Sequence, residues 1–136
     1  MTDRASIEKI IQDAYAARAA KDLDALARIF KADGVFHLAG SPATFPGAVR
    51  SEGEAQLRSS LSSLIREFDF LEQTLLTSVI EDNKAAMHWR VKVKHNSSGK
   101  TFVTEVIDLW TLDGGRVASL LQFCDTALVA SFMTSQ

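Results

Sequence analysis

The sequence predicts an α+β fold in which three N-terminal helices pack on a strongly curved, mixed but mainly antiparallel sheet that encloses a pocket. Apolar residues recur at three- and four-residue spacing in the first half of the chain, which indicates amphipathic helices. In the second half they alternate with polar residues or run continuously between polar turns, which indicates strands. Helices that precede the strands are typical of an α+β domain. The 136 residues are enough for a single domain, residues 1–136, with one core.

The composition excludes several classes of protein. A net charge of −2 gives no indication of a nucleic-acid or membrane-surface partner. No apolar run approaches the roughly 18 residues that cross a bilayer, and the N-terminus lacks the apolar stretch of a signal peptide, so we expect a cytoplasmic protein. The single cysteine, Cys124, excludes an internal disulfide and a multi-cysteine metal site. We expect neither a metal nor an organic cofactor.

Two helices are predicted before the first strand. Asp3 or Ser6 can cap a helix that runs to about residue 21, and Tyr15 lies at the edge of its apolar stripe. Asp22 can cap a second helix, which we expect the Asp-Gly pair at 33–34 to end. A short strand over residues 35–38 is predicted to follow.

A loop and a third helix are predicted next. Residues 39–51 contain both prolines and two glycines, so we expect no regular ladder there, and such a loop can cover a cavity. The third helix is predicted from Ser51 to about Arg66. Ser51 and Glu54 have the spacing of a capping box, and leucines recur on one face of the segment that follows.

Three long strands follow in the sequence, and we predict them over residues 68–80, 85–95 and 100–112. Turn length determines the register of a hairpin, and a four-residue loop joins the last two of these strands. Arg90 then lies opposite Glu105 on the polar face. Met87 lies opposite Asp108 on the apolar face. Asp108 is therefore expected among apolar side chains, where an ionised carboxylate is costly.

The turn at Gly114 and Gly115 leaves two registers open for the last strand. A tight two-residue turn places Asp108 on one face with Leu121, Phe123 and Asp125. A bulged turn of odd length places Leu120, Gln122 and Cys124 on that face instead. The two registers differ in whether a second carboxylate shares a wall with Asp108.

Several short motifs resemble those of the NTF2-like (cystatin-like) superfamily and, within it, of the SnoaL-like and ketosteroid-isomerase-like branch. They are residues 21–26 (KDLDAL), 30–33 (FKAD), 37–40 (HLAG), 53–55 (GEA), 106–109 (VIDL) and 113–117 (DGGRV). The resemblance covers essentially the whole chain. It implies a cone-shaped sheet around a pocket and a homodimer formed through the outer face of the sheet, where Val103, Ile107 and Leu109 lie beside charges. It also favours the register with Gln122 on the pocket wall.

The resemblance gives a mixed indication of activity. In ketosteroid-isomerase relatives a carboxylate base works with a tyrosine and a protonated aspartic acid, and Asp108 matches that acid. The base position falls on Leu38, which cannot accept a proton, and the tyrosine position falls on Ala14, beside Tyr15. We therefore do not expect a true ketosteroid isomerase. In polyketide-cyclase relatives an aspartate near the end of the last strand is the acid/base, and Asp125 resembles it.

Two functions are compatible with these residues. The first is proton transfer on a small hydrophobic molecule, of an isomerase-like or cyclase-like kind, and its candidate catalytic residues are Asp108, Asp125, His37 and Tyr15. The second is small-molecule binding, or a dimer scaffold, without catalysis. In either case the expected wall of the pocket consists of Phe36, Leu38, Met87, Trp89, Val91, Val106, Trp110, Leu120, Gln122 and Cys124.

Overall fold

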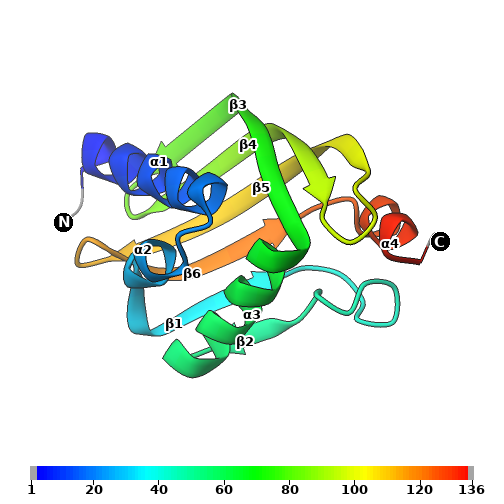
Figure 1. Ribbon diagram of the computed structural model, residues 1–136. Coiled ribbons are helices and arrows are strands. Elements are labelled where there is room, and N and C mark those ends of the chain that lie inside the picture. The colour runs from blue at the N-terminus through cyan, green and yellow to red at the C-terminus, as the bar shows by residue number, and fades with distance from the viewer. Residues whose placement is uncertain (1–2, 135–136) are drawn as a thin grey trace.

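A computed structural model describes residues 3–134 of the chain. Its elements, in chain order, are α1 (Arg4–Ala20), α2 (Leu23–Arg28), β1 (Phe30–Leu38), β2 (Arg50–Glu52), α3 (Glu54–Glu67), β3 (Phe68–Glu81), β4 (Lys84–His95), β5 (Thr101–Asp113), β6 (Arg116–Phe123) and α4 (Thr126–Thr134) (Figure 1). Within residues 3–134, no helix is both long enough and apolar enough to span a membrane.

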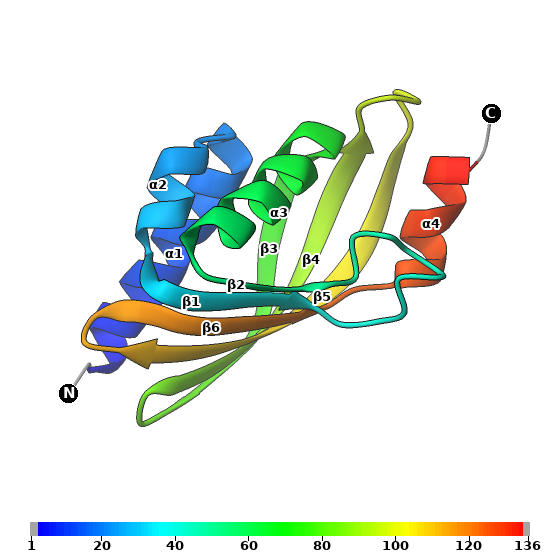
Figure 2. The same cartoon turned by 90° about the horizontal axis from the view of Figure 1, so that it is seen from below.

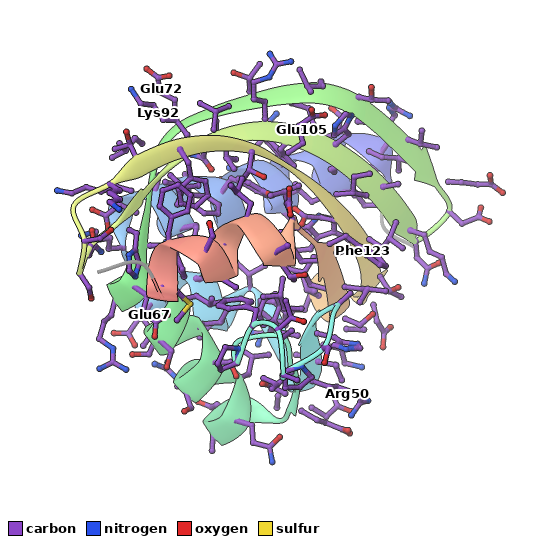
Figure 3. The ribbon with its side chains drawn as sticks, turned by 90° about the vertical axis from the view of Figure 1, so that its right-hand side faces the viewer. Arg50, Glu67, Glu72, Lys92, Glu105 and Phe123 are labelled. Carbon is purple, nitrogen blue, oxygen red and sulfur yellow. The ribbon has the colours of Figure 1, made fainter. Side chains whose placement is uncertain are left out.

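The strands form one sheet in the order β2-β1-β6-β5-β4-β3. β1 and β6 are parallel, and all other neighbours are antiparallel. Helices α1, α2 and α3 lie together on one side of this sheet (Figure 2). The sheet arches around the interior, and α4 lies across its open end (Figure 3). The predicted α+β fold, with a mixed and mainly antiparallel sheet, is confirmed.

Side-chain caps fix the starts of the first two helices as the sequence predicts. The Asp3 carboxylate accepts from the Ser6 backbone N–H at 2.8 Å at the start of α1. The Asp22 carboxylate accepts from the Ala25 N–H at 3.0 Å at the start of α2. Each carboxylate satisfies a backbone donor that has no partner inside the helix.

The end of the second helix and the start of the third differ from prediction. α2 ends at Arg28, and β1 already begins at Phe30, because this segment pairs with β6 around a register shift. The expected capping box is wrong as well: Ser51 belongs to β2 and pairs with Phe36 of β1. Gly53 caps α3 instead, with a φ of 86° that favours glycine.

The C-terminal helix α4 was not predicted from the sequence. Asp125 caps it, accepting from the Leu128 N–H at 3.0 Å. Val129 is buried, and the ring of Phe132 stacks on that of Phe102 at 4.4 Å between centroids. These contacts are made with distant strands, so tertiary packing stabilises this short helix more than local sequence does.

The two hairpins that contain β5 determine where Asp108 lies. Its predicted pairing with Met87 is confirmed, and so is the pairing of Arg90 with Glu105. On the other side the Gly114–Gly115 turn is tight, with Asp113 opposite Arg116. A bulge farther along, after Leu112 pairs with Val117, then shifts the register by one residue. Asp108 consequently lies opposite Gln122.

Candidate functional site

An apolar cavity lies between the helices and the inner face of the sheet, with a volume of about 100 Å³. All four helices, the loop before β2 and five strands contribute to its wall. The lining residues are Ala14, Tyr15, Arg18, Leu26, Phe30, Phe36, Leu38, Phe45, Leu61, Leu64, Phe68, Phe70, Val91, Val93, Phe102, Thr104, Val106, Asp108, Trp110, Leu120, Gln122, Cys124 and Val129. Most are aliphatic or aromatic, so the few polar groups among them determine what chemistry the cavity supports.

Asp108 is the most deeply buried of these polar residues, at 0% exposure. Its position on β5, between Met87 and Gln122 on the two neighbouring strands, turns its side chain to the inner face. The Tyr15 hydroxyl donates to Oδ2 of Asp108. The Gln122 side-chain amide donates to Oδ1 at 2.9 Å. Each carboxyl oxygen therefore has one protein donor, and each keeps a lone pair free for another group.

Tyr15 reaches Asp108 from α1, on the opposite side of the cavity from the sheet. Its ring stacks on the Trp89 ring, with centroids 3.9 Å apart and planes 19° apart. Burial, together with the neighbouring Asp108, raises the pKa of Tyr15 well above its ordinary value of 10.0. The phenol therefore keeps its proton and acts as a fixed donor to the carboxyl group.

The environment of Asp108 moves its titration close to neutral pH. Burial raises its pKa from 3.8 to about 6, because an ionised carboxylate is poorly stabilised in an apolar interior. The hydrogen bonds from Tyr15 and Gln122 favour the ionised form and oppose this rise. A carboxyl group with a pKa of about 6 is suited to both accepting and donating a proton near neutral pH.

Arg18 lies on the same side of α1 as Tyr15, one turn farther along, and was not among the expected site residues. Its Nη2 donates to the backbone oxygens of Leu64 at 3.1 Å and of Phe68 at 2.7 Å. The guanidinium lies over the Phe70 ring, 4.2 Å from its centroid. Burial lowers the pKa of Arg18 to about 10, so it still carries its charge near neutral pH. The available signal was a cation within the apolar stripe of the first helix.

Eight of the residues expected on the pocket wall do line the cavity: Phe36, Leu38, Val91, Val106, Trp110, Leu120, Gln122 and Cys124. Met87 and Trp89 do not. Both are buried, and the Trp89 ring packs against the ring of Tyr15 instead.

Burial raises the pKa of the Cys124 thiol to about 11, so the thiol remains protonated and is a poor nucleophile.

Two of the expected catalytic residues lie outside the cavity. Asp125 is exposed, and its carboxylate caps α4. His37 lies between Phe36 and Leu38 on β1, and these two neighbours both line the cavity, so His37 faces the opposite side of the sheet. Leu38, on which the expected base position falls, is 2% exposed and lies on the wall. Of the four candidates, the structure brings together Asp108 and Tyr15.

Several wall residues were missed from the sequence because they come from elements that pack over the sheet. Phe45 is 1% exposed and reaches the cavity from the proline-containing loop. Val129 reaches it from α4, and Leu61 and Leu64 from α3. Among the described residues, no group of three or more His, Cys, Asp or Glu side chains is arranged to hold a metal ion.

Solved structures share this architecture. A proposed isomerase from Bacillus subtilis superposes with a TM-score of 0.85 at 15% sequence identity, over 99% of this chain and 98% of that chain. A proposed SnoaL-like polyketide cyclase from Jannaschia sp. CCS1 gives a TM-score of 0.81 at 16% identity, over 100% and 99%. An NTF2-like protein from Burkholderia thailandensis gives 0.75 at 24% identity, over 93% and 96%. No curated protein matches the sequence significantly.

The curved sheet, the helices on its inner face and the cavity between them define an NTF2-like fold. The SnoaL-like domain family matches residues 11–120. The chain therefore belongs to the SnoaL-like domain family, as its motifs indicated.

Proposed function

We propose that this protein binds a small, largely apolar molecule in the cavity and that Asp108 moves a proton on it, without a metal or organic cofactor taking part. The observation that carries the proposal is a wholly buried carboxyl group with a pKa of about 6 on the wall of an apolar cavity. Strongly shifted carboxyl groups in clefts are characteristic of acid/base sites.

The reaction that fits one carboxyl group is a shift of a proton between two carbons. The ionised Asp108 takes a proton from the carbon between a carbonyl group and a C=C double bond, and the electron pair of the broken C–H bond delocalises onto the carbonyl oxygen as a dienolate. The protonated Asp108 then returns the proton to the far carbon of the former double bond, which moves the double bond into conjugation with the carbonyl and restores the carboxylate. No atom is gained or lost, and one residue serves as base and acid in turn.

We do not assign Tyr15 the role of a hydrogen-bond donor to the carbonyl group of the substrate. Its hydroxyl proton is already donated to Asp108, so we assign Tyr15 and Gln122 as positioning residues that hold the carboxyl group. His37 and Asp125 lie outside the cavity, and Leu38 cannot accept a proton. The proton transfer therefore depends on Asp108 alone, unlike the arrangement of a ketosteroid isomerase.

The size of the cavity favours isomerisation of a small carbonyl compound over cyclisation of a polyketide. An apolar cavity of about 150 Å³ accommodates benzene in another protein. The cavity here has a volume of about 100 Å³. It suits a molecule with on the order of six non-hydrogen atoms.

The proposal is tested by proton exchange into a small ketone. Cyclopentanone, incubated with the protein in heavy water, should exchange the hydrogens beside its carbonyl faster than in buffer, as measured by proton NMR. Asp108→Asn should reduce the protein-dependent rate by on the order of 10² to 10⁴. The control Asp82→Asn removes a carboxylate from the exposed turn between β3 and β4 and should exchange like the original protein.

Binding without catalysis is the second candidate, and the presence of Leu38 at the expected base position favours it. Under this alternative Asp108 anchors one polar group of a bound molecule. Cyclopentanone would then shift backbone amide signals of cavity residues without exchanging its hydrogens above the buffer rate. Equal exchange in the original protein and in Asp108→Asn would refute proton transfer and leave this second function.

We also propose that two copies associate through the outer face of the sheet. Val103, Ile107 and Leu109 on β5 and Phe123 on β6 are exposed there, at 58%, 45%, 41% and 45%. Lys92 and Glu105 project from the same outer side (Figure 3), so this face carries both charges and is able to complement itself under a two-fold axis.

Sedimentation equilibrium tests the dimer. We expect about twice the chain mass of 14.9 kDa. Ile107→Glu should yield monomer, because it places a charge between Val103 and Leu109 on the apolar part of the face, whereas the control Val49→Glu, at an exposed valine in the loop before β2, should not. A monomer at micromolar concentration would contradict the proposal.

A further inference from the structure

The guanidinium of Arg18 is a buried charge that forms no ion pair with the described residues. Arg18 lines the cavity, and its Nη2 is occupied by two backbone oxygens. Its Nη1 is buried and has no hydrogen-bond partner among the described residues. None of the ion pairs within residues 3–134 includes Arg18. Buried charges in proteins are normally paired, so the missing partner indicates a place for an anion.

The acidic side chain that acts electrostatically on Arg18, Asp69, does not fill this place. Asp69 influences Arg18 electrostatically, but its Oδ1 lies 2.8 Å from Lys21 Nζ and also accepts from the Asn96 side chain at 2.9 Å. Trp110, which also lines the cavity and is 2% exposed, has a buried indole N–H that lacks an acceptor among the described residues. Two residues of the cavity wall thus carry buried donors without acceptors in the described part of the chain, and a molecule bound in the cavity could supply them.

We propose that the cavity selects molecules carrying a single carboxylate, which pairs with Nη1 of Arg18 while the rest of the molecule lies among the apolar side chains. Arginine suits a carboxylate because its donors lie in the plane that the two oxygens occupy. One guanidinium balances one negative charge. A phosphate near neutral pH would bring a charge closer to two, and the described residues of the wall offer no second cation beside Arg18 to balance it.

This inference rests on the proposed function only in requiring that the cavity binds small molecules, and it names their class as short oxo- or unsaturated monocarboxylic acids. Tyr15 and Arg18 are three residues apart on α1, so their positions differ by about 4.5 Å along the helix axis. A short acid bound at Arg18 therefore extends toward the part of the wall where Tyr15 holds Asp108.

The test compares crotonate with crotonamide, which has the same carbon skeleton but no charge. Backbone amide NMR titrations should show that the original protein binds crotonate at least about tenfold more tightly than crotonamide near neutral pH. Arg18→Met should abolish this preference, whereas Arg18→Lys, which retains a cation, should preserve part of it. Arg66→Gln, a change at an exposed arginine on α3, is the matched control and should bind both molecules like the original protein.

Equal affinity for crotonate and crotonamide in the original protein would overturn the inference, and this comparison does not depend on whether any variant folds. A preference that survives in Arg18→Met would overturn it too, since Arg18 would then serve only to tie α1 to α3 and β3. If cyclopentanone still binds or exchanges when crotonate shows no preference, the carboxylate site is refuted while the proposed function stands.

Discussion

Replacement of Asp108 by Asn should remove a specific part of the pH dependence of folding. The pKa of Asp108 is about 6 in the folded protein and near 3.8 in the unfolded chain. Below about pH 4 both states hold the proton, so the contribution to stability is fully present. Above about pH 4 the unfolded chain loses this proton while the folded protein keeps it, so the free energy of unfolding falls as the pH rises. The fall ends once the pH has passed about 6, where Asp108 is ionised in the folded protein as well.

The magnitude follows from the size of the pKa shift. A rise from 3.8 to about 6 corresponds to about 3 kcal/mol of stability lost between about pH 4 and pH 7. No reduction for solvent screening applies, because Asp108 is 0% exposed. An asparagine side chain does not ionise, so the variant lacks this part of the pH dependence. The Tyr15 hydroxyl is able to accept from the new amide, so the variant keeps a connected network.

Urea unfolding at several pH values measures this difference. The free energy of unfolding of Asp108→Asn, minus that of the original protein, should increase by about 3 kcal/mol across the interval. Carboxylates with lowered pKa values, at Asp3, Asp24, Asp69 and Asp113, act in the opposite sense but are present in both proteins. Asp82→Asn should follow the original protein. Parallel curves for Asp108→Asn and the original protein would refute the buried-carboxyl reasoning.

Two further substitutions separate the roles of neighbouring residues. Tyr15→Phe removes the hydroxyl that stabilises the ionised carboxylate, so the pKa of Asp108 should rise above about 6 in a carboxyl NMR titration. A lower pKa in this variant would contradict the assignment of Tyr15 as a donor that stabilises the ionised form. Asp125→Ala removes the cap of α4 and should lower the free energy of unfolding by about 1 kcal/mol in urea unfolding. The variant should exchange the hydrogens of cyclopentanone at the rate of the original protein. A slower exchange without a loss of stability would show that Asp125 takes part in catalysis.

The register around Asp108 was predictable from sequence because its causes are local. Alternation in β4 and β5 and the length of the turn between them are enough to place Asp108 opposite Met87. The register with β6 was one of two alternatives, and its cause differs from the expected bulged turn. The turn at Gly114 and Gly115 is tight, and the bulge that shifts the strand lies beyond Val117, where nothing local marks it.

Other features depend on packing between distant segments, which the sequence pattern does not contain. Phe30 is equally apolar on a helix or a strand, and its place in β1 follows from pairing with Val117 of β6. α4 is held by contacts such as the stacking of Phe132 on Phe102. Arg18 lies in the apolar stripe of α1, but only the fold reveals that one of its nitrogens lacks a partner among the residues described.

The most direct test of the proposed site is the pKa of Asp108 itself, measured by carboxyl NMR titration of the original protein with Asp108→Asn used to assign the signal. Because Asp108 is buried on the cavity wall, its pKa should be about 6. A value at or below the 3.8 of a solvated aspartate would contradict it, because the group would then be a permanently ionised structural carboxylate with no proton to exchange near neutral pH.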